Sequence, residues 1–191
     1  MRAKKRGAYS FCAFDLETTN LSADFGVVLC GVTQIGGEPY ALHSQRELSP
    51  MWHSRSDRDF EVVQALLHEL GRADFWIAHN GANFDIPFLQ TRAAKWGLAF
   101  PPTRPLLDPV ILSRRKFRLS SNRLETLARV FNCPPKTPLH PGDWLAATLA
   151  RDEPAIKRIE KHCIRDVQIL NALAPRFRGM WRHLSSTGVF I

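Results

Sequence analysis

The amino-acid sequence predicts an α/β protein with a mixed, five-stranded sheet flanked by helices. Three observations point to this fold class. A chain of 191 residues, 45% of them hydrophobic, is long enough for one well-packed domain. Its first part carries three strand-like runs, with a Gly36-Gly37 turn signal between the second and the third. Strand-like and helical segments then alternate, and a hairpin followed by such alternation is typical of a mixed sheet with an antiparallel start.

Five segments are expected to form strands because they are short and rich in apolar, aromatic or β-branched residues. The first strand is expected to be buried and to end on Asp15. The expected strands cover residues 9–15, 26–35, 38–44, 75–79 and 105–112. No repeat and no internal linker interrupts them, so we expect a single domain over residues 9–175. A basic arm of residues 1–8 precedes it, and a tail of residues 176–191 follows.

Apolar residues at helical spacing predict four helices. These helices cover residues 57–70, a segment that starts near residue 86, and residues 122–131 and 154–173. We expect Gly71 to stop the first helix and Pro87 to lie in the first turn of the second. Asn122 and Glu125 have the spacing of a capping box for the third. The last helix carries an apolar face made of Ile156, Ile159, Cys163, Val167 and Leu170.

Composition excludes several classes of protein. No apolar run approaches the roughly 18–20 residues that a membrane-spanning helix needs. The basic start is followed by an apolar run that stops at Asp15, so no export signal is expected. The four cysteines have neither Cys-x-x-Cys nor disulfide-framework spacing, which indicates free thiols in a reducing compartment. The sequence therefore predicts a cytoplasmic protein that is neither a disulfide scaffold, a zinc finger nor a membrane protein.

The net charge of +8 indicates an anionic partner, and nucleic acid and an acidic membrane surface both have this property. Basic residues gather at residues 2–6 and again at Arg114, Arg115 and Lys116. Contacts with a nucleic-acid backbone and a plain solvated surface are both compatible with such runs. The distribution of the acidic residues favours nucleic acid, because several of them fall in short, recognisable clusters.

The first acidic cluster is Asp15 and Glu17. Residues two apart in a strand point to the same face, so these carboxylates would lie side by side at the end of an apolar strand. Adjacent carboxylates raise each other's pKa unless a cation neutralises them. Their hard oxygen ligands suit Mg²⁺ or Mn²⁺. An exposed strand end without a metal is the alternative interpretation.

Two further clusters follow in the sequence. Asp85 falls at a strand-to-helix junction, where it would serve either as a metal ligand or as an ordinary helix N-cap. His162 and Asp166 are four residues apart on the last helix, so they lie about 40° apart at the rim of its apolar face. Taken alone, each of these two clusters favours a local structural role.

The three clusters together resemble the signature of the DEDD exonuclease superfamily. That signature has Asp-x-Glu on a strand, then Asn-x-x-x-Phe-Asp before a helix, and an aspartate on a final helix. The proofreading exonuclease domains of family B DNA polymerases and their free-standing relatives are the most similar branch. Its second motif is matched here by Asn80, Phe84, Asp85, Pro87, Phe88 and Leu89. The resemblance extends over residues 9–173.

This resemblance implies a ribonuclease H-like fold and a 3′–5′ exonuclease that acts on single-stranded nucleic acid with two divalent metal ions, Mg²⁺ or Mn²⁺. It implies that Asp15, Glu17 and Asp166 hold the first metal, and that Asp15 and Asp85 serve the second. Two such cations about 3.5–4 Å apart stabilise both the attacking and the leaving oxygen.

The resemblance also implies residues that bind the substrate. Thr18 and Leu21 would grip the terminal nucleotide, with Leu21 wedged against the last base and Phe84 close to it. Asn80 corresponds to an asparagine that contacts the substrate. Arg114, Arg115 and Lys116 are candidates for contacts with the backbone of the strand. DNA is expected in preference to RNA.

The last motif departs from the family. One branch of the family has Tyr-x-x-x-Asp, and the other has His-x-x-x-x-Asp. This chain has a histidine at the spacing of the tyrosine, His162-x-x-x-Asp166. Lys161 stands where the second branch has its histidine. We expect His162 to be the general base, because a residue at i−4 shares a helix face with Asp166. Its ordinary pKa of about 6.5 suits a base at neutral pH better than that of a tyrosine.

Two other functions fit the same motifs: a ribonuclease H-like endonuclease and a non-catalytic nucleic-acid-binding module. A proofreading role would need a polymerase or another replication or repair protein as partner, because 191 residues leave no room for a polymerase domain. The expected ligands are single-stranded 3′ ends, and no membrane partner is expected. The sequence does not predict an oligomeric state.

Overall fold

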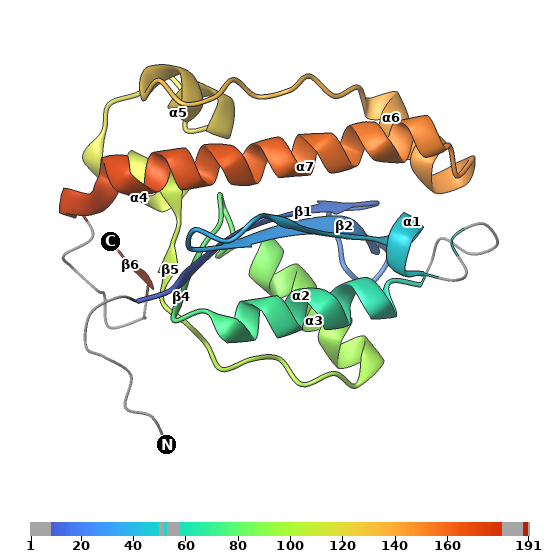
Figure 1. The fold of residues 1–191 in the computed structure, drawn as a ribbon. Coiled ribbons are helices and arrows are strands. Elements are labelled where there is room, and N and C mark those ends of the chain that lie inside the picture. Colours follow the sequence, from blue (N-terminus) through green and yellow to red (C-terminus); the bar gives the residue numbers. More distant parts are fainter. Residues whose placement is uncertain (1–8, 50–51, 53–57, 181–188, 191) are drawn as a thin grey trace.

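The computed structural model describes residues 9–49, 52, 58–180 and 189–190. In these ranges a six-stranded sheet of order β3-β2-β1-β4-β5-β6 lies between two helical layers (Figure 1). Its strands are β1 (Phe11–Thr18), β2 (Val28–Ile35), β3 (Ala41–Ser44), β4 (Phe75–Ile77), β5 (Leu106–Leu107) and β6 (Val189–Phe190). The helices are α1 (Gln45–Leu48), α2 (Phe60–Arg72), α3 (Asp85–Trp96), α4 (Pro109–Lys116), α5 (Leu124–Val130), α6 (Pro141–Leu149) and α7 (Glu153–Leu173), with a 3-10 helix at Ala174–Met180.

The sheet confirms the predicted fold class. β2 pairs with β1 and with β3 in antiparallel fashion, while β4 and β5 run parallel to β1. Each of the five predicted strands is present with adjusted bounds. The sheet also contains a sixth strand that was not among the predicted five. This two-residue strand, β6, pairs in parallel with β5 at the edge of the sheet. The rest of the chain beyond Met180, like the basic run at residues 2–6, lies outside the described residues.

The prediction of a strand over residues 105–112 is wrong after Leu107, because the segment continues as helix α4. The Asp108 carboxylate accepts the Val110 backbone N–H at 2.9 Å and caps the new helix. Pro109 suits the first helical position, where no N–H is needed. The apolar residues that suggested a strand are Val110 and Leu112, which α4 buries.

Two predicted helix signals are also wrong. Helix α2 continues through Gly71 to Arg72, and it starts at Phe60 rather than at residue 57, which lies outside the described residues. Asn122 does not cap α5, since its side-chain oxygen accepts the Ser113 hydroxyl at 2.8 Å. The N-cap of α5 is Arg123, whose side chain makes no capping bond. The short helices α1 and α6 were not predicted.

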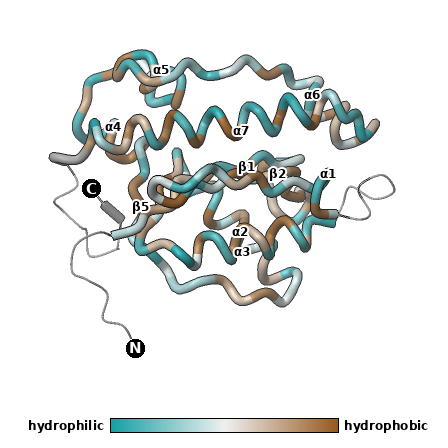
Figure 2. The backbone as a smooth tube through the Cα atoms, in the orientation of Figure 1, coloured by the Kyte–Doolittle hydropathy of each residue, from teal (hydrophilic) through white to brown (hydrophobic). Residues whose placement is uncertain are grey.

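The sheet separates two apolar cores. Cys12, Phe14 and Leu16 of β1 pack with α2 and α3, whereas Ala13 packs with α7. All five residues of the predicted apolar face of α7 are fully buried in this second core. Brown and teal alternate along α7 in Figure 2, as expected for a helix with one apolar face.

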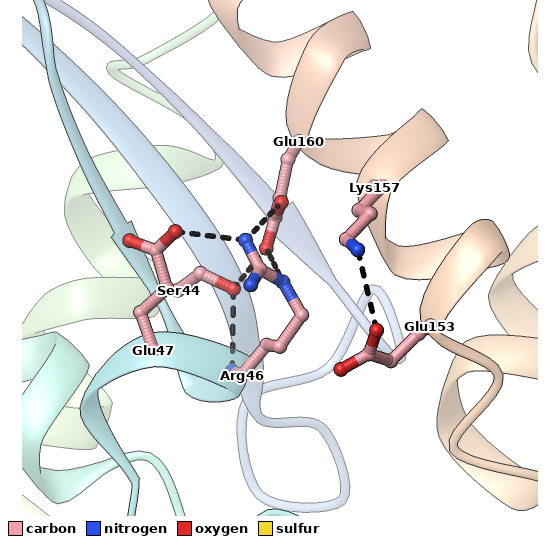
Figure 3. A network of polar contacts seen from close by, with 6 residues as sticks. All are labelled: Ser44, Arg46, Glu47, Glu153, Lys157 and Glu160. Carbon is pink, nitrogen blue, oxygen red and sulfur yellow. Dashed lines mark hydrogen bonds and ion pairs between the residues drawn. The ribbon is translucent and has the colours of Figure 1, made fainter.

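A polar clamp fixes α7 to the junction of β3 and α1 (Figure 3). The buried Ser44 hydroxyl donates a hydrogen bond to the Glu160 carboxylate. The Arg46 guanidinium donates to both oxygens of the same carboxylate, at 3.1 and 3.0 Å. The helix is therefore anchored two residues before His162.

All four cysteines are free thiols. Among the described helices, none is sufficiently long and apolar to span a membrane.

Candidate active site

Strand β1 places the first two predicted site residues on the face that α7 covers. Cys12, Phe14 and Leu16 point to the opposite core, so the alternation of a strand turns Asp15 and Glu17 toward α7. The Cys163 thiol of α7 donates a hydrogen bond to the Asp15 backbone oxygen at 3.3 Å, which ties the helix to the strand at this point. Glu17 is 9% exposed and Asp15 is half-buried.

Asp85 reaches the site through a tight turn between β4 and α3. Asn80 has φ of 62°, and a Cβ on Gly81 would lie 2.4 Å from Ala78 Cβ, so glycine is needed there. Asp85 is the first residue of α3, and Phe84 rather than Asp85 holds the N-cap position. Its carboxylate accepts the backbone N–H of Leu16, which lies between Asp15 and Glu17.

Asp108 fixes this turn, although the sequence analysis did not single it out. Its carboxylate accepts the backbone N–H of Asn80 at 3.0 Å and that of Ala82 at 3.3 Å, in addition to the N–H of Val110. One buried side chain therefore holds both the turn that delivers Asp85 and the start of α4.

Helix α7 supplies His162 and Asp166, which are 8% and 4% exposed. His162 Nε2 lies 3.8 Å from Asp166 Oδ2, as the i, i+4 spacing predicted. The other ring nitrogen, Nδ1, is 2.9 Å from the Thr137 hydroxyl. Burial lowers the pKa of His162 below its ordinary value, and the charge of Lys136 adds to this, whereas Asp166 acts in the opposite direction.

Lys136 is a member of the site that the sequence analysis missed. It lies in the segment between α5 and α6, and its Nζ is 2.6 Å from Asp166 Oδ2. Burial disfavours its charge, but the carboxylates of Asp166, Asp15 and Glu17 outweigh burial and raise the pKa of Lys136 above its ordinary value. An ammonium group thus partly offsets the negative charge of the acidic cluster.

The four predicted acids form one electrostatic cluster. Burial, and then the charges of Asp166, Asp85 and Glu17, hold the pKa of Asp15 well above its ordinary range. Burial and the charge of Asp166 raise the pKa of Glu17 to about 8. Burial raises the pKa of Asp85 to about 7. Carboxylates perturbed in this way by burial and by one another are typical of functional sites and of sites for cations.

The donor chemistry of this cluster fits divalent metal ions. Carboxylate oxygens are the ligands that Mg²⁺ and Mn²⁺ prefer. Asp166 Oδ1 is buried and has no hydrogen-bond partner, so one ligand atom is available. In the part of the chain that the structure describes, however, no three His, Cys, Asp or Glu side chains converge on one metal position. Metal binding would therefore require the side chains to rearrange, and the metal ion would have to displace the Lys136 ammonium from Asp166.

Two hollows flank the acidic cluster. The first, of about 320 Å³, is lined by Leu16, Glu17, Thr18, Thr19, Asn20, Leu21, Phe84 and Trp144. The second, of about 370 Å³, is lined by Glu125, Lys136, Thr137, Pro138, Leu139, Trp144 and His162. Both volumes lie at the small end of the range for ligand sites, about 300–1,000 Å³. Trp144 of α6 lines both hollows.

The structure brings together some of the predicted substrate-binding residues. Thr18, Leu21 and Phe84 line the first hollow, and Leu21 is 83% exposed. The side-chain oxygen of Asn80 accepts a hydrogen bond from the Asn83 amide at 3.0 Å, within the turn.

The three basic candidates stand apart from this group. Arg114, Arg115 and Lys116 are exposed in the last turn of α4, and they are not among the residues that line either hollow. In Figure 1, α4 lies near the C-terminal half of α7, whereas α6 lies near its start.

Comparison with known proteins gives matches of three kinds. The model of the RNase_H superfamily matches residues 12–177. The PolC-type DNA polymerase III of Ureaplasma parvum is 28% identical over 139 residues, which are 64% of this chain and 10% of that relative. The PolC-type DNA polymerases III of Mycoplasma pneumoniae and Mycoplasma genitalium are each 54% identical over 37 residues, 19% of this chain and 2% of theirs.

Among solved structures, the fold is similar to that of the family B DNA polymerase from Pyrobaculum calidifontis. The TM-score is 0.73 at 15% sequence identity, and the match covers 94% of this chain and 26% of that polymerase. The fold therefore agrees with the ribonuclease H-like expectation. The chain spans about a tenth of the length of the first relative, and a smaller share of the other two.

Proposed function

Because the chain belongs to the RNase_H superfamily, we propose that it is a metal-dependent 3′–5′ exonuclease that hydrolyses single-stranded nucleic acid. The matches to PolC-type polymerases and to a family B polymerase support its predicted relationship with DEDD-type proofreading exonuclease domains. The observation that carries the proposal is the cluster of four acids that β1, α3 and α7 bring together, in which burial and the neighbouring carboxylates raise the pKa of Asp15 and of Glu17.

In this proposal Asp15, Glu17 and Asp166 hold one divalent ion, and Asp15 and Asp85 hold a second. The bound ions would supply positive charge next to the attacking and leaving oxygens of the phosphodiester. Until metal and substrate bind, the acids would stay largely shielded from water, and Lys136 would neutralise part of their charge. The unpartnered Oδ1 of Asp166 supports its assignment as a ligand.

His162 is proposed as the general base that takes a proton from the attacking water. If its Nδ1–H donates to the Thr137 hydroxyl, the lone pair of Nε2 faces the Asp166 side of the site and can accept the proton. Its lowered pKa keeps the imidazole neutral at pH 7, as a base must be.

The first hollow is proposed as the site of the 3′-terminal nucleotide, with Thr18, Leu21 and Phe84 as its contacts. Asn80 and the basic residues Arg114, Arg115 and Lys116 remain proposed contacts further along the strand. The relatives are DNA polymerases, so we propose DNA before RNA as the substrate, and a polymerase as a partner.

The test uses single-stranded DNA and RNA of one sequence, labelled at the 5′ end, with Mg²⁺ or Mn²⁺. We expect the labelled strand to be shortened stepwise from its 3′ end, which gives a ladder of products. EDTA or the change Asp15→Asn should abolish this shortening. Asp24→Asn is the matched control, because Asp24 is an exposed acid in the neighbouring loop. The ratio of the two rates gives the preference between DNA and RNA.

Two other outcomes would overturn the proposal. Cleavage of a circular single strand would identify an endonuclease instead. Binding of the strand that persists in EDTA, with no degradation in either metal, would identify a non-catalytic binding module.

A further inference from the structure

We propose that the protein has a second nucleic-acid surface, which binds the backbone of a DNA duplex behind the single-stranded 3′ end. The inference deepens the proposed function and rests on it. The surface is formed by six exposed cations where α4, α5 and the 3-10 helix meet, and we call it the basic corner. Its members are Arg114, Arg115, Lys116, Arg118, Arg129 and Arg176.

Three phenylalanine rings hold the basic corner together. The centre of the Phe117 ring lies 5.0 Å from that of Phe131 and 5.7 Å from that of Phe177. The rings of Phe131 and Phe177 are 5.3 Å apart. Each of these rings is close in the chain to one or more of the six cations. The packing of the rings therefore brings cations from three separate segments to one surface.

Acidic residues are scarce around the basic corner. Glu125 is the only acidic residue between Asp108 and Asp143, and none follows Asp166 in the sequence. Glu125 itself lines the second hollow, on the side of the acidic cluster. Much of the net charge of +8 is therefore gathered at this corner.

The six cations also have no acidic partner among the residues that the structure describes. Several exposed cations elsewhere do have one. Arg72 Nη2 lies 2.9 Å from Glu38 Oε2, and Arg158 Nη2 lies 2.6 Å from Asp143 Oδ1. The charge of the basic corner is thus left for a partner that carries many negative charges, and a phosphate backbone is such a partner.

The aromatic rings of the basic corner favour a duplex over a single strand. Surfaces for single strands offer aromatic rings on which unpaired bases stack. Here Phe177 is fully buried, and Phe117 and Phe131 are half-buried against it. The corner therefore presents charge without a platform for bases, which matches a double helix, whose phosphates face outward and whose bases are already paired.

The position of the basic corner suits a duplex that is followed by a short unpaired end. Helices α4 and α5 lie at the end of α7 that follows Asp166 (Figure 1). At about 1.5 Å per residue, Leu173 at the end of α7 lies about 10 Å along the helix axis from Asp166. Stacked nucleotides advance about 3.4 Å each, so an overhang of eight nucleotides is long enough to reach from the corner to the acids.

The experiment compares two variants of the full chain that have the same change of net charge. The corner variant combines Arg118→Gln, Arg129→Gln and Arg176→Gln. The matched control changes three exposed cations on α2, α3 and α7, and combines Arg72→Gln, Lys95→Gln and Lys157→Gln. Circular dichroism melting of both variants checks that they remain folded.

Binding is measured in EDTA at several salt concentrations with one DNA strand of 24 nucleotides. The strand is used alone, or annealed to a complement that leaves a 3′ overhang of eight nucleotides. We expect wild type to bind the annealed substrate more tightly than the strand alone. In the corner variant the slope of log K against log salt for the annealed substrate should become shallower by about 2–3, because each lost phosphate contact removes about 0.9.

The matched control should keep the slope of wild type to within about 1, and so should the corner variant with the strand alone. Steady-state kinetics with Mn²⁺ give a second readout. In the corner variant, KM for the annealed substrate should rise toward KM for the strand alone, and this rise should exceed any fall of kcat.

Three outcomes would overturn the inference. Wild type that binds the annealed substrate no more tightly than the strand alone has no duplex surface. Equal changes of slope in the corner variant and the matched control would show a general effect of net charge. Equal losses for the annealed substrate and the strand alone would show that the corner binds single strands.

Failure of the proposed function is recognised separately. If wild type degrades neither substrate in Mn²⁺ or Mg²⁺, the exonuclease proposal fails. The binding measurements in EDTA still decide the role of the basic corner in that case, because they do not depend on hydrolysis.

Discussion

At the scale of single residues, His162 is the clearest departure from the family that the sequence resembles, because one branch of that family has tyrosine at this spacing. Its environment lowers its pKa, so we expect the activity of wild type to fall only as the pH drops below about 6.5. His162→Ala should reduce kcat by about 10²–10⁴-fold and should lose this acid limb. Initial rates between pH 5 and 9 measure both effects.

His68→Ala is the control for that series, because His68 is exposed on α2, away from the acidic cluster. A His162→Ala protein with nearly the rate and the pH profile of wild type would remove the general-base role.

The buried acids give a second prediction at this scale, for the protein in EDTA. The pKa of Asp85 is raised from 3.8 to about 7, so the folded state binds more protons than the unfolded state between these values. Its contribution to stability is therefore present below pH 4 and is lost as the pH rises toward 7. Relative to wild type, Asp85→Asn should gain stability over this interval, by more than about 1 kcal/mol.

Urea unfolding of the two proteins at pH 4, 5, 6, 7 and 8 measures this difference. Comparing variant with wild type removes the opposite contribution of the histidines, whose pKa values are lowered. A constant difference across the series would show that Asp85 is not protonated in the folded protein.

At the scale of elements, one buried ion pair joins four segments near the first hollow. Arg92 of α3 binds Asp59 through two nitrogens, at 2.7 and 2.9 Å, and donates to the Ala23 backbone oxygen at 3.1 Å. Asp59 also accepts the Val28 N–H of β2 at 2.8 Å. The pair thus connects α3, the start of α2, strand β2 and the loop that carries Leu21.

Removing one partner leaves a buried charge without its counterpart. Arg92→Met should lower the free energy of unfolding by about 3–5 kcal/mol. Lys95→Met, an exposed cation on the same helix whose Nζ lies 5.6 Å from the centre of the Trp96 ring, should change it by less than about 1 kcal/mol. Chemical denaturation at pH 7 checks both values, and equal effects of the two changes would contradict the structural role of the pair.

Elements with a strong local signal could be predicted from the sequence, and those defined by distant contacts could not. The apolar face of α7 follows from helical spacing alone, and so does the proximity of His162 to Asp166. The strand predicted over residues 105–112 was extended too far by the apolar residues of α4, although Asp108 and Pro109 are a local signal for a helix start. The role of Asp108 in the turn before α3 could not be predicted, because its partners there, Asn80 and Ala82, lie 28 and 26 residues away. Lys136 and Trp144 carry no periodic signal, since only the path of the chain over α7 brings them to the acids.

At the scale of the whole molecule, metal binding should stabilise the fold. A ligand that binds only the folded state adds about 2.7 kcal/mol at 100 times its dissociation constant. We expect Mg²⁺ or Mn²⁺ to raise the melting temperature of wild type at pH 8, and Asp15→Asn to reduce the shift. Differential scanning calorimetry with and without EDTA measures it, and identical shifts in both proteins would place the metal elsewhere.

The site also depends on the order of the three layers in the chain. Asp15 and Glu17 come from the sheet, Asp85 from the layer of α2 and α3, and Asp166 from α7 on the opposite face, near the C-terminal end of the described domain. A nascent chain therefore contains at most three of the four acids until most of α7 has been synthesised. The acidic cluster can therefore assemble only after α7, which follows the strands and helices that carry the other three acids, has been added to the chain.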